Sequence, residues 1–253
     1  MNRDILSDFV NKTLQVVQPE KDPWVFNGLQ VIGKLEVKKI ALGVSPSLDF
    51  FQKAADWGAD LIILHHGLFG PKRPQAITKV LKKRLKLLFD FDITLLSYHL
   101  YLDKHEKLGN NAQIIKLLGA KIGEKFGEQN GLYWGYEASF PKPISETDFL
   151  ARIKKLCPKT RYFGLGNNKI FRFGVVSGGG AYNVVEAIDK NFDAFLTGEI
   201  VESISSMAKE AKIHYYALGH YNSEKFGVMA LGKKIKDNFP KLEIKFIDVP
   251  NDL

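Results

Sequence analysis

The first half of the chain alternates short, continuously apolar segments with longer segments whose apolar residues recur every three or four positions. A continuous apolar run is typical of a strand buried on both faces of a sheet, and the longer period is typical of an amphipathic helix. The strands that this predicts are residues 38–45, 60–66 and 93–99, and the helices are residues 4–17, 47–57, 75–90 and 111–118. Strands that alternate with helices in this way predict a parallel sheet with helices on both faces.

Residues 120–170 break this alternation. Residues 131–140 are aromatic and rich in strand-forming residues, whereas residues 145–156 have a helical pattern that opens with Ser145. The sequence Gly-Leu-Gly-Asn-Asn at residues 164–168 is typical of a tight turn, and we expect it to join the two strands of a hairpin.

The alternation resumes after residue 170. The predicted strands are residues 171–176, 194–197, 215–218 and 242–248, and the predicted helices are residues 181–190, 199–211 and 222–237. We therefore expect an α/β protein of two similar lobes, each with a mostly parallel sheet flanked by helices. The first lobe would comprise residues 1–125 completed by residues 215–253, and the second would comprise residues 126–214.

The two halves of the chain echo each other. Residues 60–66 and 193–199 both begin with aspartate and continue into an apolar run, and this alignment places His66 opposite Glu199. In each half a third strand ends in a histidine that a carboxylate follows four residues later, as His99 and Asp103 and as His220 and Glu224. Because polar residues recur at the same strand ends, we interpret the echo as an internal duplication.

Four of the six histidines follow predicted strands at their carboxyl ends, namely His65, His66, His99 and His220. The carboxyl ends of parallel strands share one edge of a sheet, which is where ligands bind in α/β proteins. Adjacent strand residues point to opposite faces, so His65 and His66 serve one site only if the chain turns there, which Gly67 permits. A helix cap plus a core histidine is the alternative for this pair. We leave His105 and His214 out of the site.

The donors at these strand ends suit a metal. Imidazole and carboxylate groups without sulfur fit zinc, iron, manganese, cobalt or nickel. Glu224 lies one helical turn after His220 and so faces the same side of the last helix. Together with Asp103 the donors exceed what one tetrahedral ion needs, and two divalent ions bridged by a carboxylate would account for the surplus.

Two other motifs are weaker. The segment Ser177-Gly178-Gly179-Gly180 follows a predicted strand and would either cradle a phosphate at a helix start or form a plain tight turn. It lacks the Walker lysine and the Gly-x-Gly-x-x-Gly pattern. No Gly-x-Ser-x-Gly elbow is present for a serine hydrolase.

Composition narrows the class of protein. With 253 residues, 45% hydrophobic and 25% charged, the chain has a globular composition. The single cysteine, Cys157, excludes an internal disulfide and a cysteine-based metal cluster, and it suits a reducing compartment. The N-terminus does not resemble a signal peptide and no apolar run has the length of a membrane span, so we expect a cytoplasmic location and no membrane partner.

The net charge of +8 raises the question of nucleic-acid binding. Much of the excess lies in residues 79–86, where Val80, Leu81, Leu85 and the nearby Leu88 recur at helical spacing. We therefore prefer the solvated face of an amphipathic helix to a nucleic-acid surface.

These residues resemble the GTP cyclohydrolase I type 2 homologue family, also called Nif-three-like dinuclear-metal hexamers. The resemblance covers essentially the whole chain. The segments that carry it are residues 24–33, 65–67, 99–103, 109–111, 177–180, 197–199 and 219–224.

The resemblance implies two similar α/β lobes and a toroid of six chains with metal sites facing its interior. It implies five ligands for two ions, with Glu224 bridging and Asp103 a second candidate bridge: His65, His66, Asp103, His220 and Glu224. His99 and Glu199 would lie beside the metals as supporting or acid–base groups. The chain is the short form without an inserted middle domain. It has Leu100-Tyr101-Leu102 where many members have Thr-Asn-Leu, so its pocket is less polar and a shared substrate does not follow.

We rank three functions. The first is a metal-dependent hydrolase acting on a C–N or phosphoester bond of an unidentified small molecule. The second is a non-catalytic metal-binding or regulatory assembly, which needs the ligands but not His99 or Glu199. The third is a ring that binds nucleic acid through basic charge.

Overall fold

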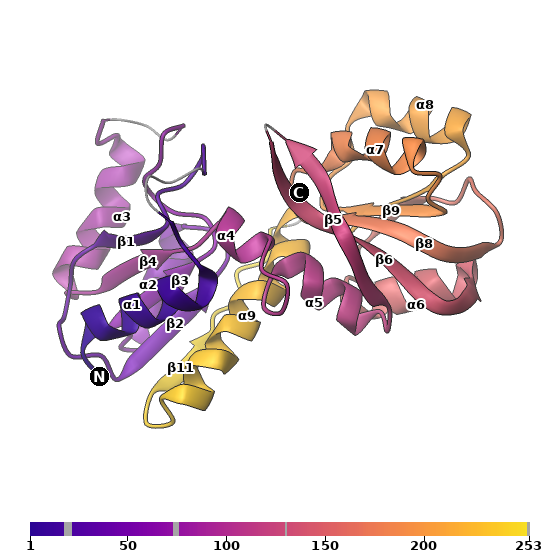
Figure 1. The fold of residues 1–253 in the computed structure, drawn as a ribbon. Coiled ribbons are helices and arrows are strands. Elements are labelled where there is room, and N and C mark those ends of the chain that lie inside the picture. Colours follow the sequence, from indigo (N-terminus) through magenta and orange to yellow (C-terminus); the bar gives the residue numbers. More distant parts are fainter. Residues whose placement is uncertain (18–21, 73–75, 130, 252–253) are drawn as a thin grey trace. The chain divides into compact units, whose positions relative to one another are not determined.

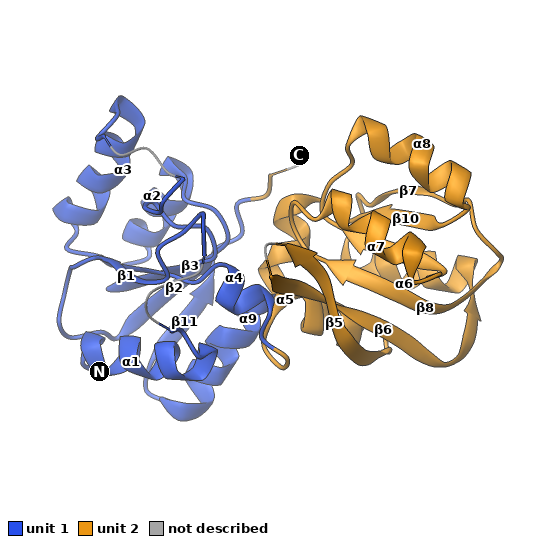
Figure 2. Ribbon diagram, turned by 45° about the horizontal axis from the view of Figure 1, so that its top comes forward, with its two compact units in different colours: residues 1–105, 227–249 blue, residues 106–226, 250–253 orange. Residues whose placement is uncertain are grey.

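The computed structural model describes residues 1–17, 22–72, 76–129 and 131–251. The chain divides into two compact units, shown in blue and orange in Figure 2. The first unit comprises residues 1–105 and 227–249, and the second comprises residues 106–226 and 250–253. The lobe limits expected from the sequence stay a prediction.

The described part of the first unit is built on a sheet with the strand order β1-β4-β3-β2-β11. Its bounds are β1 (Gly28–Val31), β2 (Lys39–Gly43), β3 (Leu61–Leu64), β4 (Thr94–Ser97) and β11 (Glu243–Phe246). The last four strands are mutually parallel, and β1 runs antiparallel to β4 at one edge. All residues of β3 and β4 are buried, as continuous apolar runs predict.

Helices cover both faces of this sheet (Figure 1). They are α1 (Arg3–Leu14), α2 (Leu48–Asp56), α3 (Lys79–Asp90), the short α4 (Leu100–Asp103) and part of α9 (His220–Asn238). On one face, Phe50 and Leu85 from α2 and α3 join the core cluster of Ala41 and Ile62. On the other face, Leu42 packs so closely against Gly232 of α9 that a Cβ atom at residue 232 would not fit.

The described part of the second unit contains a sheet with the order β5-β6-β8-β9-β10-β7. Its strands are β5 (Lys121–Gln129), β6 (Leu132–Ser145), β7 (Arg161–Phe163), β8 (Lys169–Val176), β9 (Ala194–Thr197) and β10 (His214–Ala217). The parallel centre, β8-β9-β10, is flanked by antiparallel strands. The helical segments are α5 (Asn110–Leu117), α6 (Glu146–Leu156), η1 (Ala181–Asn183), α7 (Val184–Asp189) and α8 (Glu202–Ala211). The α/β class is thus confirmed, with a mixed second sheet.

Two expectations need correction. The hairpin at residues 164–168 is wrong: β7 pairs with β10, because β8 is already paired with β6 on one side and β9 on the other. Helix α3 starts at Lys79, capped by Thr78, and part of its predicted N-terminal extension lies outside the described residues.

Helix α3 is amphipathic, which agrees with the interpretation of its basic residues as the solvated face of a helix. Its buried face consists of Leu81, Leu85 and Leu88, while its lysines face solvent. Val80 was expected on the apolar stripe, but this residue is 54% exposed. Within the described ranges, no helix combines the length and the apolar character needed to cross a membrane.

The internal echo extends to hydrogen bonds. The Asp60 carboxylate accepts the backbone N–H groups of Lys38 and Lys39 at 2.8 and 3.0 Å. In the second unit, the Asp193 carboxylate accepts the N–H groups of the equivalent residues 171 and 172 at 2.8 and 2.9 Å. Each aspartate thus ties the start of one parallel strand to the preceding strand of its sheet. The two units therefore share one local construction around β2-β3-β4 and β8-β9-β10.

Candidate metal centre

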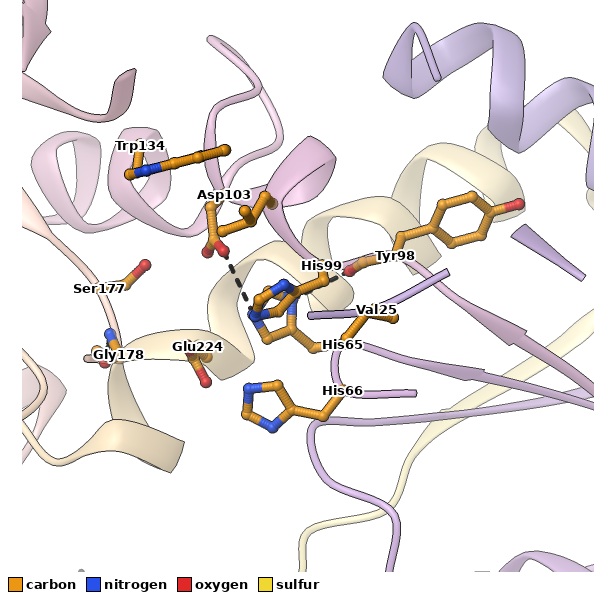
Figure 3. Close-up of polar contacts among 12 residues, drawn as sticks. Val25, His65, His66, Tyr98, His99, Asp103, Trp134, Ser177, Gly178 and Glu224 are labelled. Carbon is orange, nitrogen blue, oxygen red and sulfur yellow. Dashed lines mark hydrogen bonds and ion pairs between the residues drawn. The ribbon is translucent and has the colours of Figure 1, made fainter. Parts of the chain in front are cut away.

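Three histidines meet at the carboxyl ends of β3 and β4 in the first unit (Figure 3). The ring centroid of His65 lies 4.9 Å from the ring centroid of His66 and 4.9 Å from that of His99. The ring centroids of His66 and His99 are 5.5 Å apart. One ring nitrogen from each lies within 4.8 Å of the others, close enough for a metal-binding group. The turn expected after the strand therefore brings His65 and His66 to the same place.

Hydrogen bonds determine which ring nitrogen can act as a donor to a metal. Nδ1 of His65 is 3.0 Å from the backbone oxygen of Tyr98, and Nδ1 of His99 is 3.0 Å from the Asp22 carboxylate. Because a carbonyl and a carboxylate only accept, each Nδ1 must carry the hydrogen, and in the neutral ring Nε2 then has the lone pair. His66 Nδ1 is 3.0 Å from the Ser45 hydroxyl, which can donate or accept.

Asp103 brings a carboxylate to the same cluster. The N–H groups of Leu102 and Asp103 donate to the backbone oxygen of His99, which forms the single turn of α4 directly after the strand. This turn places Oδ2 of the buried Asp103 3.4 Å from Nε2 of His65, as drawn in Figure 3. The spacing of four residues between His99 and Asp103 is thus the length of this turn.

The loop after the two histidines is held by Gln30 on β1. Its Oε1 accepts the N–H groups of Leu68 and Phe69 at 2.8 and 3.2 Å. Its Nε2 donates to the backbone oxygens of Phe26 and Phe69 at 2.7 and 3.0 Å. A Cβ atom on Gly67 would come within 2.2 Å of this amide, so a glycine is needed for the close approach. Gln30 therefore fixes where the chain goes after His66.

In the second unit, His220 lies between two carboxylates. Its Nδ1 is 2.5 Å from Oε1 of Glu199, and its Nε2 is 3.2 Å from Oε2 of Glu224, one turn along α9. Burial alone would lower the pKa of His220, but the carboxylates of Glu224 and Glu199 outweigh it and raise the pKa to about 10. The negative charge around this imidazole favours a cation at this point.

The turn at residues 177–180 is built around Glu224. Gly178 has a φ of +62°, and a Cβ atom there would lie 2.0 Å from Oε1 of Glu224. The N–H of Ser177 donates to Asn111 and that of Gly178 to Ser223, at 2.7 and 2.9 Å. Because the side chains of Asn111 and Ser223 accept these two N–H groups, the groups do not point to a phosphate. The structure therefore favours the tight turn over the phosphate cradle.

Sequence reasoning missed Asp22. Its buried carboxylate accepts hydrogen bonds from Asn27, Trp24 and the ring of His99. Burial would raise the pKa of Asp22, but these bonds outweigh it and lower the pKa to about 2. The Asp-Pro pair that opens a turn-rich segment was the only signal, and it indicates a turn and not a partner 77 residues away.

The two histidines left out of the site have other partners. Nε2 of His105 lies 3.1 Å from the backbone oxygen of Thr13, and Nε2 of His214 lies 2.7 Å from that of Asn167. His105 therefore contacts the last turn of α1, and His214 contacts the segment before β8, each within its own unit.

The chemistry of both donor sets fits divalent transition metals. The first unit supplies imidazoles whose tautomers expose Nε2, beside a buried carboxylate, and the second supplies an imidazole with a carboxylate on each nitrogen. Histidines that ligate metals commonly have the other ring nitrogen bound to a carboxylate or a backbone carbonyl. The fold and these strand-end clusters define an α/β protein with a candidate histidine–carboxylate metal site.

The comparisons with known proteins agree on one family. Residues 1–252 match the model of the family described as Duf34/NIF3 (NGG1p interacting factor 3). The chain is 37% identical to a relative from Buchnera aphidicola subsp. Schizaphis graminum, over 99% of both sequences, and 36% identical to one from Pyrococcus horikoshii, over 100% of both. Both relatives have the name GTP cyclohydrolase 1 type 2 homolog. The chain belongs to the Duf34/NIF3 family, which confirms the resemblance.

Solved structures support the fold. The structure of protein ybgI, described as of unknown function, has a TM-score of 0.91 and 33% sequence identity over 100% of both chains. The reduced HcgD protein from Methanocaldococcus jannaschii has a TM-score of 0.82 and 28% identity over 98% of both chains. The similarity therefore extends over both units of this chain.

Proposed function

We propose that this protein binds two divalent metal ions and uses them to hydrolyse a small-molecule substrate. The observation that carries the proposal is the orientation of the strand-end histidines, whose Nδ1 atoms bind carbonyl or carboxylate oxygens and whose Nε2 atoms are thereby assigned the lone pair. His105 and His214 also bind a backbone oxygen, but they do so outside these strand-end clusters.

The ligands in this proposal are those that the family resemblance implies. The first unit contributes His65, His66 and Asp103, and the second contributes His220 and Glu224. The resemblance implies that both donor sets would serve one pair of ions, with Glu224 as the bridging carboxylate.

A pair of such ions would supply Lewis acidity to activate water and to stabilise developing negative charge. The residues of the chain would hold the ions and move protons. His99 and Glu199 are the candidates for proton transfer. Glu199 is already bound to Nδ1 of His220, so its first effect is to orient that ring. His99 is the better candidate because its Nε2 has the lone pair.

The proposal specifies the chemical class of the substrate and not a particular compound. A cyclic amide, a ring C–N bond or a phosphoester fits this chemistry. The names of the relatives add GTP as a compound to test. The proposal also retains the homohexamer that the resemblance implies and the cytoplasmic location expected from the sequence.

Hydrolysis by the metal-loaded protein tests the proposal. Protein stripped of metal and reloaded separately with zinc, manganese, iron, cobalt or nickel is expected to hydrolyse at least one of GTP, hydantoin and bis(p-nitrophenyl) phosphate. The His99→Gln variant is expected to lose roughly 10²–10⁴-fold in rate, the usual contribution of a general base. His105→Gln is the matched control, because His105 contacts a backbone oxygen elsewhere, and it should keep the wild-type rate.

The contrary result identifies the second function. If no metal form hydrolyses any of the three compounds although two ions bind, the hydrolase proposal fails for these substrate classes. The metal-binding assembly is then the better account. An equal rate in His99→Gln and wild type would remove His99 from the chemistry.

A further inference from the structure

The loop of residues 22–27 holds His99 by several contacts at once. The ring Nδ1 meets Oδ2 of Asp22 at 3.0 Å, and the His99 backbone N–H donates to Oδ1 of Asn27 at 2.6 Å. The ring of Trp24 meets the imidazole edge-on, with centroids 6.3 Å apart at 70°. Both the position and the rotation of the imidazole are therefore set by this loop.

The Asp22 carboxylate is itself held rigidly. Oδ1 accepts the N–H groups of Trp24 and Val25 at 2.9 and 3.2 Å. Oδ2 accepts from the Asn27 amide and from the N–H of Leu100, both at 3.1 Å, in addition to His99. Its side chain is 0% exposed, while that of His99 is 12% exposed. A buried carboxylate thus lies behind an imidazole whose other side reaches solvent and the cluster of His65 and His66.

We propose that Asp22 is the positioning residue of an Asp22–His99 pair in which Nε2 of His99 accepts a proton from a water or substrate group at the metal centre. The inference rests on the proposed function, because it names the proton acceptor of the same site. The five ligands already supply donors for two ions, so His99 is not needed as a sixth. When Nε2 takes the proton, the ring becomes an imidazolium, and the Asp22 carboxylate offsets its charge.

The tautomer of His99 in metal-free protein tests the inference directly. Two-bond ¹⁵N–¹H correlation spectra of protein labelled at histidine, assigned with His99→Gln, are expected to show hydrogen on Nδ1 and none on Nε2 in the wild type. In Asp22→Asn, an amide N–H2 replaces an acceptor near Nδ1, and we expect the form with hydrogen on Nε2 to appear. Hydrogen on Nε2 in the wild type, or an unchanged tautomer in Asp22→Asn, would overturn the inference.

A matched control separates positioning from general damage. Asp60→Asn alters another aspartate that accepts two backbone N–H groups in the same unit, and it should leave the His99 spectrum unchanged. If Asp22→Asn does not fold, the tautomer of His99 in the wild type still tests the inference. A ring with hydrogen on Nε2 cannot accept a proton at Nε2.

Metal content distinguishes a proton acceptor from a ligand. Asp22→Asn and His99→Gln are expected to retain the wild-type number of zinc ions per chain, whereas His65→Gln loses zinc. Loss of zinc in Asp22→Asn equal to that in His65→Gln would make His99 a ligand and overturn the acceptor role. If even the wild type binds no zinc, the proposed function fails, and the proton acceptor at a metal centre fails with it. A wild-type protein that binds two ions but has hydrogen on Nε2 of His99 overturns the inference alone.

Discussion

Replacing Gly178 with alanine is expected to weaken metal binding by roughly 10–100-fold, the usual effect of disturbing the groups that position metal ligands. A Cβ atom at this position would lie 2.0 Å from Oε1 of Glu224 and 3.3 Å from Nε2 of His220. The carboxylate or the turn must therefore move. Alanine at the positive φ of this position also strains the backbone, which lowers the free energy of unfolding by about 1–2 kcal/mol. Isothermal titration with zinc and urea unfolding measure the two effects.

The control for this variant is Gly58→Ala. Gly58 has a similar φ of +75°, and nothing lies within 4 Å of its Cβ position. It should show the same backbone strain with unchanged zinc affinity. Equal zinc affinity in Gly178→Ala and Gly58→Ala would mean that the turn does not position Glu224.

Replacing Gln30 with alanine is expected to lower the free energy of unfolding by about 2–3 kcal/mol, because partly buried backbone groups of the loop after His66 lose their partners. The side chain makes four hydrogen bonds to backbone atoms of Phe26, Leu68 and Phe69. The freed loop no longer fixes the chain beside His66, so zinc affinity should fall as well. Urea unfolding and zinc titration of the same preparation check both effects.

Gln52→Ala provides the comparison. Gln52 is an exposed helical residue whose amide donates to Asp56 one turn away. Substitution of such a surface residue usually changes stability by less than about 0.5 kcal/mol. If Gln30→Ala is no less stable than Gln52→Ala, the loop is held by its other contacts and Gln30 has no role in placing His66.

The strand-end histidines could be predicted because topology determines their place. A continuous apolar run ends at Leu64, and any residue that follows a parallel strand lies at the same sheet edge as its neighbours. His65 and His99 therefore come together without knowledge of loop conformation, whereas His66 joins them only because the chain turns after the strand. Glu224 could be placed beside His220 for a similar reason, since residues four apart share a helix face.

Other features depend on contacts that local patterns do not encode. Asp22 binds His99, 77 residues later in the chain, and no periodicity relates the two. The expected hairpin at residues 164–168 failed because β8 has neighbours on both sides, which is a property of the whole sheet. The exposed Val80 shows that a stripe of apolar residues on a helix can be wider than the face that is buried.

The measurement that tests the central claim most directly is elemental analysis of purified protein after brief metal loading, with wild type beside Glu224→Ala. Two bridged ions predict about two ions per wild-type chain and one or fewer in the variant. Glu202→Ala, which alters an exposed glutamate in the first turn of α8, is the control and should keep the wild-type number. One ion or fewer in the wild type, unchanged in Glu224→Ala, would mean that the strand-end clusters are not a dinuclear centre.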